Sequence, residues 1–512
     1  MGAWWRSARD PAGSDAGAMT RIDGRRLGYR IASLAPGRLG AVAAFAADQA
    51  CLHAGVEPER LDQTVQRLLD AADRSLAQQD LDRAADLAAK AHILAFHRHH
   101  VEASLPVRDV EVDQEHLAPF RRSQVGRLLH GTTAPGSDPT GSSTGDPLLA
   151  GSGRSPLRVL VVAYRNFTFI ERVITESTAR GDIAWQRLDL ADLGLAPFLR
   201  EGPLTRARLH AAVSGERVQP PPELARALEE CDVVLVEWGH HALAYMSLLD
   251  GVGADFGGVP LVTRLHRQEL DTAYVHLVDV PRVDRWLFIA THIARRAQVV
   301  IPGLGRQRVR LVHNVNDLSR FTAEKSEGAA RTLLHVGWSR PLKDVEFAFD
   351  ILERLRAEDP SWRLLLAGPG PATDTPTPWT TRVLERRRAL GDAVVELGHR
   401  DDMEAVLRDA GFLLSTSLSE GSHESVAEGA AAACVPVVRN WPVVRAYGGA
   451  ASEYPQSWVV DDVDAAVARI RSLAEPGTRD RAGQEARRTI LEQRRPGTIL
   501  DDYASVLREA VS

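Results

Sequence analysis

Two glutamates separated by seven residues, Glu420 and Glu428, mark the part of the sequence best suited to chemistry. Glu420 follows an apolar run and a string of small polar residues, and Glu428 lies roughly two helical turns later in an alanine-rich segment. A strand that leads through a loop into a helix presents free N–H groups and the positive end of the helix dipole, which favour phosphates. A carboxylate on that helix can accept hydrogen bonds from a ribose diol. The stretch predicts a site for a nucleoside diphosphate, and the alternative is an ordinary turn with two surface glutamates.

Basic and imidazole side chains follow other apolar runs in the same way. Arg340 and Lys343 come shortly after the run at residues 332–336. A forked guanidinium and a compact ammonium suit a diphosphate, although the alternative is a solvated basic loop. His266 directly follows another apolar run, at the strand end where open α/β sheets place their sites. It could donate a hydrogen bond to a hydroxyl or shuttle a proton, and the alternative is a polar loop histidine.

Near-continuous apolar runs predict the elements that position these residues. The first, LRVLVVA at Leu157–Ala163, is typical of a strand covered on both faces. Further runs lie at 232–236, 261–265, 286–289, 299–301, 332–336, 363–367, 394–397, 412–414 and 435–438. Helical patterns separate them, and this alternation predicts an α/β fold with doubly wound parallel sheets. The G-x-G-x-x-G fingerprint of dinucleotide-binding folds is missing after the first run.

The glutamate pair resembles the signature EGFGLxxLEAMAxGxPVV of retaining GT-B glycosyltransferases, and of glycosyltransferase family 4 (glycosyl transferases group 1) in particular. The matching positions are Glu420, Gly421, Glu428 and Pro436. Ser422 and His423 stand where the pattern has Phe and Gly, and one extra residue precedes Pro436. The resemblance extends from about residue 157 to the C-terminus. It implies a GT-B fold: two Rossmann-like domains, here preceded by a helical module.

Weaker motifs of the same family occur in the expected order. The string RLHxxE places His266 against the donor sugar. The segment VGRLxxxKG aligns Lys343 with the family's phosphate-binding lysine. Trp338 takes the usual arginine position, and Arg340 follows two residues later. The loop containing Arg400 corresponds to one beside the nucleobase.

The resemblance implies transfer of a sugar from a nucleoside-diphosphate sugar to an acceptor hydroxyl, with retention of configuration, by a hexosyltransferase. His266 and Glu420 are the expected catalytic residues. The expected donor-binding residues are Arg340, Lys343, Gly421, Ser422, His423, Glu428 and Arg400. Lys343 and Arg340 would neutralise the departing diphosphate. Glu428 would hold the ribose, and Glu420 a hydroxyl of the donor sugar. We expect no metal, since no Asp-x-Asp site is evident, and no cofactor besides the donor.

Two other functions stay open at this point. A sugar-nucleotide epimerase with the same fold would isomerise the donor without an acceptor. A non-catalytic nucleotide-sugar-binding protein would bind the donor without turnover. The sugar, the base and the acceptor, which could be a glycan, a lipid-linked sugar or a small molecule, are not specified by these motifs.

Composition divides the chain into parts. The predicted divisions are a helical accessory module (1–131), a linker (132–156), an acceptor domain (157–325), a donor domain (326–495) and a C-terminal helix (496–512). The linker is dominated by Gly, Ser, Thr and Pro, which predicts that the module can be separated from the rest. Residues 312–321 resemble the family's interdomain hinge. The last helix is expected to return to the first of the two sheet domains.

Overall composition excludes several classes of protein. The 512 residues carry a net charge of −6, which gives no general argument for nucleic-acid binding. Three scattered cysteines fit a reducing cytoplasm, and no run of about 18 apolar residues predicts a spanning helix. Trp4 and Trp5 beside Arg6 suggest peripheral contact with the inner membrane face, or else a disordered leader; Met19 could be the start. The helical module could bind a protein partner.

Overall fold

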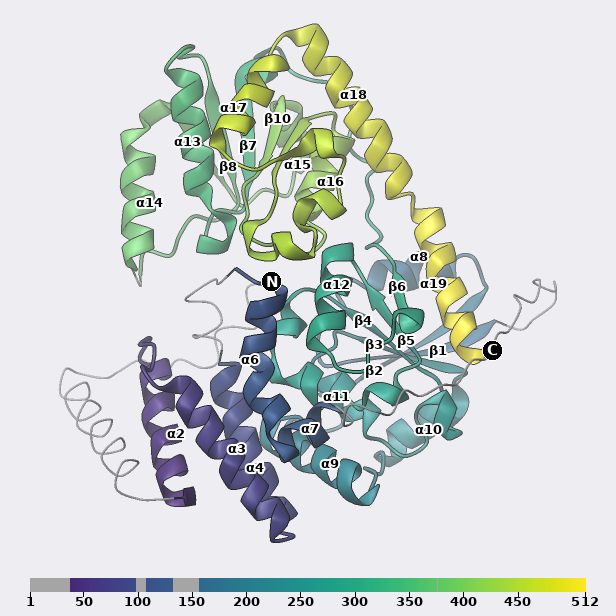
Figure 1. The fold of residues 1–512 in the computed structure, drawn as a ribbon. Helices are drawn as coiled ribbons and strands as arrows, with labels where there is room; N and C mark the ends of the chain where they lie inside the picture. Colours follow the sequence, from purple (N-terminus) through teal and green to yellow (C-terminus); the bar gives the residue numbers. More distant parts are fainter. Residues whose placement is uncertain (1–36, 98–106, 132–155, 375) are drawn as a thin grey trace.

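A computed structural model describes residues 37–97, 107–131, 156–374 and 376–512. A helical module packs beside a first sheet domain, a second sheet domain lies beyond it, and the C-terminal helices run along both (Figure 1). The predicted linker, apart from Pro156, lies outside the described residues, as does the tryptophan-containing N-terminus.

The first domain is built on a parallel sheet of six strands in the order β2-β1-β3-β4-β5-β6. Its strands are β1 (Leu157–Ala163), β2 (Ile183–Asp189), β3 (Val233–Glu237), β4 (Leu261–Leu265), β5 (Arg285–Phe288) and β6 (Val309–Leu311). Its helices are α8 (Glu171–Thr178), α9 (Glu201–Ser214), α10 (Pro222–Glu230), α11 (His241–Ser247) and α12 (Thr291–Val300). Short 3-10 helices are η1 (Ala254–Phe256), η2 (Gln268–Asp271), η3 (Ala273–Leu277), η4 (Val280–Arg282) and η5 (Arg306–Arg308). The strands β3 and β4 are buried along their whole length, as their apolar runs predict.

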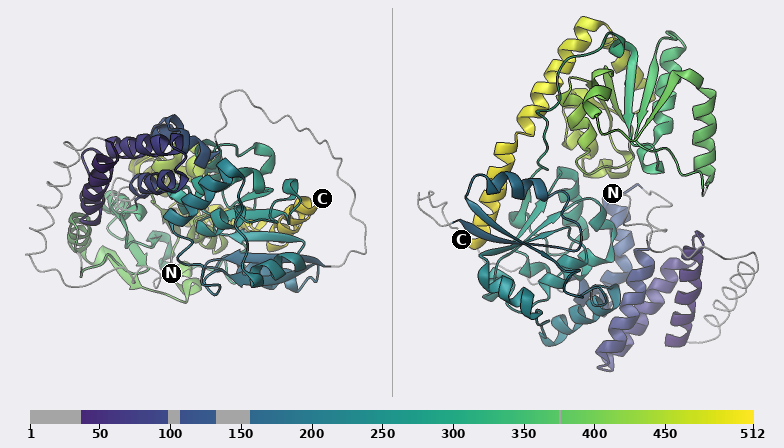
Figure 2. Two further views of the ribbon diagram at one scale, coloured as in Figure 1. Left: turned by 90° about the horizontal axis from the view of Figure 1, so that it is seen from below. Right: turned by 180° about the vertical axis from the view of Figure 1, so that it is seen from behind.

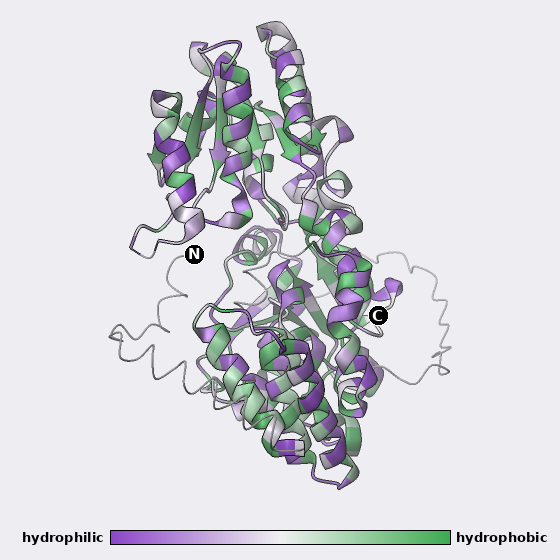
Figure 3. Cartoon of the chain, turned by 60° about the vertical axis from the view of Figure 1, so that its left-hand side comes forward, coloured by the Kyte–Doolittle hydropathy of each residue, from purple (hydrophilic) through white to green (hydrophobic). Residues whose placement is uncertain are grey.

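The second domain repeats the plan with a parallel sheet in the order β12-β11-β10-β7-β8-β9. Its strands are β7 (Thr332–Val336), β8 (Arg363–Ala367), β9 (Val394–Gly398), β10 (Phe412–Ser415), β11 (Val435–Arg439) and β12 (Val459–Val460). Its helices are α13 (Val345–Arg356), α14 (Pro378–Ala389), α15 (Met403–Arg408), α16 (Glu424–Ala431) and α17 (Val463–Ser472). Its 3-10 helices are η6 (Glu327–Arg331), η7 (Pro341–Lys343), η8 (Gly391–Ala393), η9 (Pro442–Tyr447), η10 (Gly449–Ser452) and η11 (Gln456–Trp458). Figure 3 shows hydrophobic strands inside this domain and hydrophilic outer faces on its helices.

The predicted GT-B arrangement of two doubly wound parallel sheets is confirmed. The strand prediction missed three strands, β2, β6 and β12, and placed one strand where the structure has a helix. All three missed strands lie at sheet edges, where most side chains are exposed or half-buried and leave no long apolar run. The expected strand at 299–301 is instead the end of α12, whose apolar residues form the buried face of a helix.

The helical module consists of α2 (Gly37–His53), α3 (Leu61–Ala77), α4 (Leu81–Ala95), α6 (Val110–Arg122) and α7 (Gln124–His130). Asp80 separates α3 from α4, and its carboxylate caps α4 by accepting a hydrogen bond from the Arg83 N–H at 3.1 Å. The module does not stand apart, contrary to the linker argument. One continuous buried cluster joins Leu87 of α4 to Leu204 and Leu209 of α9. The composition of a linker does not predict whether the two parts of the chain that it joins pack together through apolar faces.

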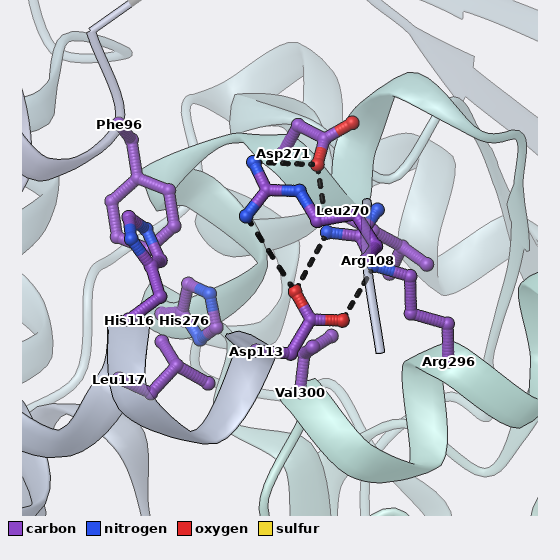
Figure 4. Close-up of a pocket in the computed structure, with 10 residues that line it drawn as sticks. All are labelled: Phe96, Arg108, Asp113, His116, Leu117, Leu270, Asp271, His276, Arg296 and Val300. Atoms are coloured by element: carbon purple, nitrogen blue, oxygen red, sulfur yellow. Dashed lines mark hydrogen bonds and ion pairs between the residues drawn. The ribbon is translucent and has the colours of Figure 1, made fainter. Parts of the chain in front are cut away.

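The module also reaches the second domain. Asp113 of α6 is buried and accepts two hydrogen bonds from Arg296, at 2.9 and 3.1 Å, and one from the Tyr447 hydroxyl at 2.7 Å. Arg296 also donates to Asp271 at 2.8 Å, and Arg108 adds a second guanidinium to the cluster. Figure 4 shows these charged side chains converging between the module and the first domain. Three parts of the chain therefore meet at one buried network of charges.

The C-terminal helices connect the two sheet domains. Helix α18 (Pro476–Gln493) packs on α16 and β11 of the second domain, and α19 (Pro496–Val511) returns to the first. Tyr503 and Leu507 of α19 lie in one buried cluster with Val159 and Val161 of β1. Figure 2 shows the two helices running along one side of both domains. This crossing confirms the expected return of the last helix.

The described residues contain no helix that is both long enough and apolar enough to span a bilayer.

Candidate functional site

The loop between β10 and α16 holds the first of the spaced glutamates. The neighbouring strands β10 and β7 end at the same sheet edge, so the segment after β7 lies against this loop. That segment carries Lys343 at the end of η7, and its Nζ donates to Glu420 Oε1 at 2.6 Å. The Ser417 hydroxyl donates to the same oxygen at 2.5 Å. Two predicted site residues are thus in direct contact.

The surroundings of Glu420 hold it in the charged form. Burial alone would raise its pKa, but the charges of His423 and Lys343 and hydrogen bonds from Lys343 and Ser417 bring the pKa down to about 2. Burial lowers the pKa of His423 to about 4, and the attraction of Glu420 does not reverse this effect. At neutral pH the loop therefore combines an anionic Glu420, a cationic Lys343 and a neutral imidazole.

The start of α16 supplies main-chain groups to the same loop. His423, the residue before the helix, adopts a left-handed backbone with φ of 37°, which is unfavourable for a residue other than glycine. Its Nδ1 lies 2.8 Å from the Ser415 hydroxyl, and the side chain is buried, so packing holds this conformation. Gly421 and Ser422 precede it, and the Tyr454 hydroxyl donates to the Ser422 carbonyl at 3.0 Å. The N–H groups at this helix end are the ones suited to an anion.

Glu428 has surroundings different from those of Glu420. It lies on α16 with its side chain 26% exposed, and its nearest cation is Arg320, at 3.5 Å from Oε1. Burial raises its pKa, and the charge of Arg320 only partly opposes this. Arg320 also pairs with Glu404 at 3.2 Å. Arg320 is shared between Glu404 and Glu428, and the Glu428 side chain is partly exposed. The Glu428 carboxylate can therefore leave its ion pair with Arg320 and accept hydrogen bonds from a neutral diol.

Glu424, which the sequence reasoning did not select, links two segments. One is the loop between β10 and α16 (residues 416–423), the predicted donor loop, and the other is the predicted hinge (residues 312–321). The Asn314 amide donates to Glu424 Oε1 at 2.8 Å and to the Ser422 hydroxyl at 3.1 Å. Asn316 and Ser422 also donate to this carboxylate. The two asparagines in the segment VHNVND were the available signal, because they lie in the predicted hinge segment and carry amide donors.

His266 lies at the corresponding edge of the first sheet. It follows β4, and its Nε2 is 3.2 Å from the buried Glu237 carboxylate, while its backbone N–H donates to Glu269 at 2.9 Å. Its ring stacks on Trp238 with centroids 4.0 Å apart, and Phe169 lies 5.1 Å away. Two carboxylates and two aromatic rings fix the orientation of this imidazole.

A buried chain of hydrogen bonds joins the two sheet edges. The fully buried Arg264 lies 3.4 Å from Glu237 and donates to the Asn314 oxygen at 3.1 Å. It also donates to the Tyr503 hydroxyl of α19 at 2.5 Å. Because Glu237 contacts His266 and Asn314 contacts the donor loop, the two edges and the crossing helix form one polar network.

Comparisons with known proteins agree with this geometry. The family model described as Glycosyl transferases group 1 matches residues 330–475. The second domain is thus similar to the group 1 glycosyltransferases. Two curated relatives are GDP-mannose:cellobiosyl-diphosphopolyprenol alpha-mannosyltransferases. The one from Xanthomonas oryzae pv. oryzae is 23% identical over 279 residues, covering 49% of this chain and 67% of the relative. The one from Xanthomonas campestris is 26% identical over 208 residues, covering 38% of this chain and 48% of the relative.

A solved structure has the same fold. Anabaena HepE, determined in complex with UDP, aligns with 69% of this chain and 100% of its own, with a TM-score of 0.50 and 14% identity. At 14% identity this structural similarity is evidence for the fold alone. The family match covers the second domain, from β7 to α17, so it includes the loop with Glu420 and Lys343.

The two arginines predicted to bind the donor lie on exposed loops. Arg340 immediately precedes η7 and is exposed, whereas Trp338, in the usual arginine position, is buried and donates to the Gly368 carbonyl at 3.2 Å. Arg400, in the loop after β9, pairs with Asp402 at 2.6 Å. The Arg340 carbonyl accepts a hydrogen bond from the Lys343 N–H at 3.0 Å. Neither arginine's side chain forms a hydrogen bond or ion pair with Glu420 or Lys343 in the described structure, so their roles toward a ligand stay predictions.

The described residues contain no group of three or more His, Cys, Asp or Glu arranged to hold a metal ion. Its three cysteines are buried and unpaired.

Proposed function

We propose that this protein is a glycosyltransferase that transfers a hexose from a nucleoside-diphosphate sugar to a hydroxyl of a free or lipid-linked glycan, with retention of configuration. The observation that carries the proposal is the contact between Lys343 and Glu420 at the N-terminal end of α16. It places an exchangeable cation, a carboxylate kept anionic and free main-chain N–H groups in one loop. The family match over residues 330–475 supports sugar transfer, and the GDP-mannose and UDP named for similar proteins suggest the donors to test first.

The donor's diphosphate would lie against the start of α16. Lys343 would turn from Glu420 toward the phosphates, and the N–H groups around Ser422 and His423 would bind phosphate oxygens. Arg340, exposed on the neighbouring loop, would add a second cation. Glu428 would exchange Arg320 for the ribose diol, and the loop with Arg400 would lie beside the base.

The donor sugar would lie between the two sheet edges. Because Nε2 of His266 meets Glu237, Nδ1 is the ring atom that would meet a sugar hydroxyl. Glu420, released from Lys343, would accept a hydrogen bond from another hydroxyl. The charge that develops on the leaving diphosphate would be stabilised by Lys343, which is in place before the reaction.

The test is donor consumption by the full chain. GDP-mannose and UDP-glucose are incubated with and without methyl β-cellobioside, and products are resolved by mass spectrometry and by NMR of the anomeric proton. The proposal predicts release of GDP or UDP, and an α-linked product from either α-linked donor. Isomerised donor without release would mean an epimerase, and binding without any turnover would mean a binding protein.

A further inference from the structure

The helical module and the first domain pack together as one body through α6 and α12. Leu117 of α6 lies in the same buried apolar cluster as Ile293 and Ala297 of α12. The Arg121 guanidinium of α6 also donates to the carbonyl of Val299 in α12 at 3.3 Å. A contact between α6 and the second domain therefore links the second domain to the whole of this body.

A series of main-chain hydrogen bonds runs from the module into the predicted donor loop. The Arg108 N–H, just before α6, donates to the Val443 carbonyl of η9 at 2.6 Å. The Val443 N–H donates in turn to the Leu418 carbonyl at 3.1 Å, and the Leu418 N–H donates to the Leu342 carbonyl at 2.8 Å. Leu418 belongs to the donor loop, and Leu342 precedes Lys343 in η7. One residue of η9 thus joins the module to both segments that form the candidate site.

A side-chain contact attaches the far end of η9 to the module. The Tyr447 hydroxyl lies 2.7 Å from Asp113 Oδ2 and 3.1 Å from the Asp109 carbonyl. Tyr447 and Asp113 are both buried, and burial together with Asp113 raises the pKa of Tyr447, so its hydroxyl keeps its proton and can donate at neutral pH. Arg295 of α12 donates to the Tyr447 carbonyl at 3.2 Å. The module therefore holds Tyr447 by its side chain, and the first domain holds it by its main chain.

Opposite charges fix the module's side of this contact. Asp113 accepts two hydrogen bonds from Arg296, and the Arg108 guanidinium lies 3.8 Å from it (Figure 4). Asp271 also pairs with both guanidinium groups, so two carboxylates face two cations in a buried setting. Disrupting a buried network of this kind is costly, because removing one partner leaves an unpaired charge. Asp113 therefore offers Tyr447 an acceptor whose position is fixed.

We infer that the helical module holds the second domain against the first and positions the predicted donor loop, with Asp113 and Tyr447 as the positioning residues. The role of this loop in donor binding rests on the proposed function, whereas the attachment of the loop to the module does not. The first domain also reaches the loop directly, since His292 Nε2 lies 2.9 Å from the Glu420 carbonyl. A loop that is held before the donor arrives loses less entropy when the donor binds.

The test is hydrogen exchange of the full chain without nucleotide, measured on peptides by mass spectrometry. Tyr447→Phe removes only the hydroxyl that faces the module. We expect the amides of residues 416–423 and 440–448 to exchange roughly three- to thirtyfold faster, because the lost hydrogen bond has a charged acceptor. The amides of α13, in the same domain, should exchange as before. Tyr274→Phe is the matched control, since it removes a hydroxyl bonded to Glu201 inside the first domain, and it should leave both segments unchanged.

A substitution on the module's side tests whether the effect crosses from one part of the chain to another. Asp113→Asn, in α6, should accelerate exchange in the same two segments of the second domain. Combining it with Tyr447→Phe should have about the effect of the larger single change, because both break the same contact. If Asp113→Asn instead unfolds the module, exchange in α3 and α4 rises as well, and Tyr447→Phe alone decides.

Three results would overturn the inference. The first is that Tyr447→Phe leaves exchange in both segments unchanged. The second is an equal rise in α13 or in Tyr274→Phe, which would mean a general loss of stability. The third is that the effects of the two substitutions simply add in a folded double variant. Binding of GDP and UDP is measured separately by calorimetry. If neither binds the unmodified chain, the proposed function fails, and the exchange result still decides whether the module holds this loop.

Discussion

The Lys343 ammonium lies 2.6 Å from the Glu420 carboxylate on the loop between β10 and α16, with the two side chains 27% and 13% exposed. The resemblance assigned these residues to different parts of the donor. In the structure each is the other's partner, so in the proposed function a diphosphate would draw Lys343 away from Glu420. That exchange would free Glu420 to meet the sugar only when the phosphates are in place.

Replacing Glu420 with Gln should separate nucleotide binding from transfer. The uncharged amide no longer competes with phosphate for Lys343, so affinity for GDP or UDP should not fall, while transfer should drop roughly a hundredfold. Titration calorimetry and initial rates measure the two effects. Glu396→Gln, which removes an exposed partner of Arg387, is the matched control and should change neither. A parallel loss of nucleotide affinity and rate in Glu420→Gln would contradict this account.

Asn314→Ala should uncouple the two sheet edges. The substitution removes donors to Ser422 and Glu424 and an acceptor from Arg264, leaving buried polar groups unpaired. The expected loss is about 1–3 kcal/mol in free energy of unfolding, together with slower transfer. Urea unfolding and donor consumption measure both quantities. Ser319→Ala, at an exposed hydrogen bond in the neighbouring segment, serves as the control. Unchanged transfer in Asn314→Ala would show that this network only supports the fold.

The buried His92 makes stability depend on pH. Burial lowers its pKa from 6.5 to about 3, and its Nε2 lies 3.0 Å from Nε2 of His130. The unfolded chain therefore binds the proton more readily, so this contribution is complete above pH 6.5 and is lost as pH falls toward 3. His92→Gln should reduce the slope of unfolding free energy between pH 6 and pH 4 by up to about 1.4 kcal/mol per pH unit. Urea unfolding at several pH values tests this, and identical slopes would count against it.

A chain that begins at residue 151 should fold poorly. Removing the module uncovers the face of α9 that contains Leu204 and Leu209, both fully buried in the whole chain. Exposed apolar surface of this kind promotes association. Solubility, binding of an apolar dye and thermal unfolding measure the outcome. A soluble truncated chain that unfolds cooperatively and binds nucleotide would show that the two sheet domains fold without the module.

Sequence patterns predicted the elements best where burial is uniform. The run Leu157–Ala163 was placed to the residue because a strand buried between helix layers needs continuous apolar side chains. The edge strand Ile183–Asp189 was missed because exposure dilutes that pattern. The run at 299–301 was misread because a short apolar run fits a helix end as well as a strand.

The candidate site was predicted only in part, for a related reason. Motif spacing selected Lys343 and Glu420 separately, but their contact depends on β7 and β10 being neighbours, which a linear pattern does not reveal. Glu424 was passed over because its importance comes from Asn314, more than a hundred residues earlier in the chain. Packing of the helical module against the first domain could not be predicted from the sequence either, because it depends on how the apolar faces of α4 and α9 are oriented in the folded chain.

The most direct test of the central claim is a calorimetric comparison of GDP with guanosine, and of UDP with uridine, on the full chain and on Lys343→Ala and Glu428→Ala. Hydrogen bonds to charged groups contribute about 1.5–3 kcal/mol, so each substitution should weaken diphosphate binding by roughly ten- to a hundredfold. Lys343→Ala should nearly erase the preference for the diphosphate over the nucleoside. Glu428→Ala should keep that preference but lose the advantage of ribose over 2′,3′-dideoxyribose. If Lys343→Ala still prefers the diphosphate as strongly as the unmodified chain does, the loop between β10 and α16 is not the donor site.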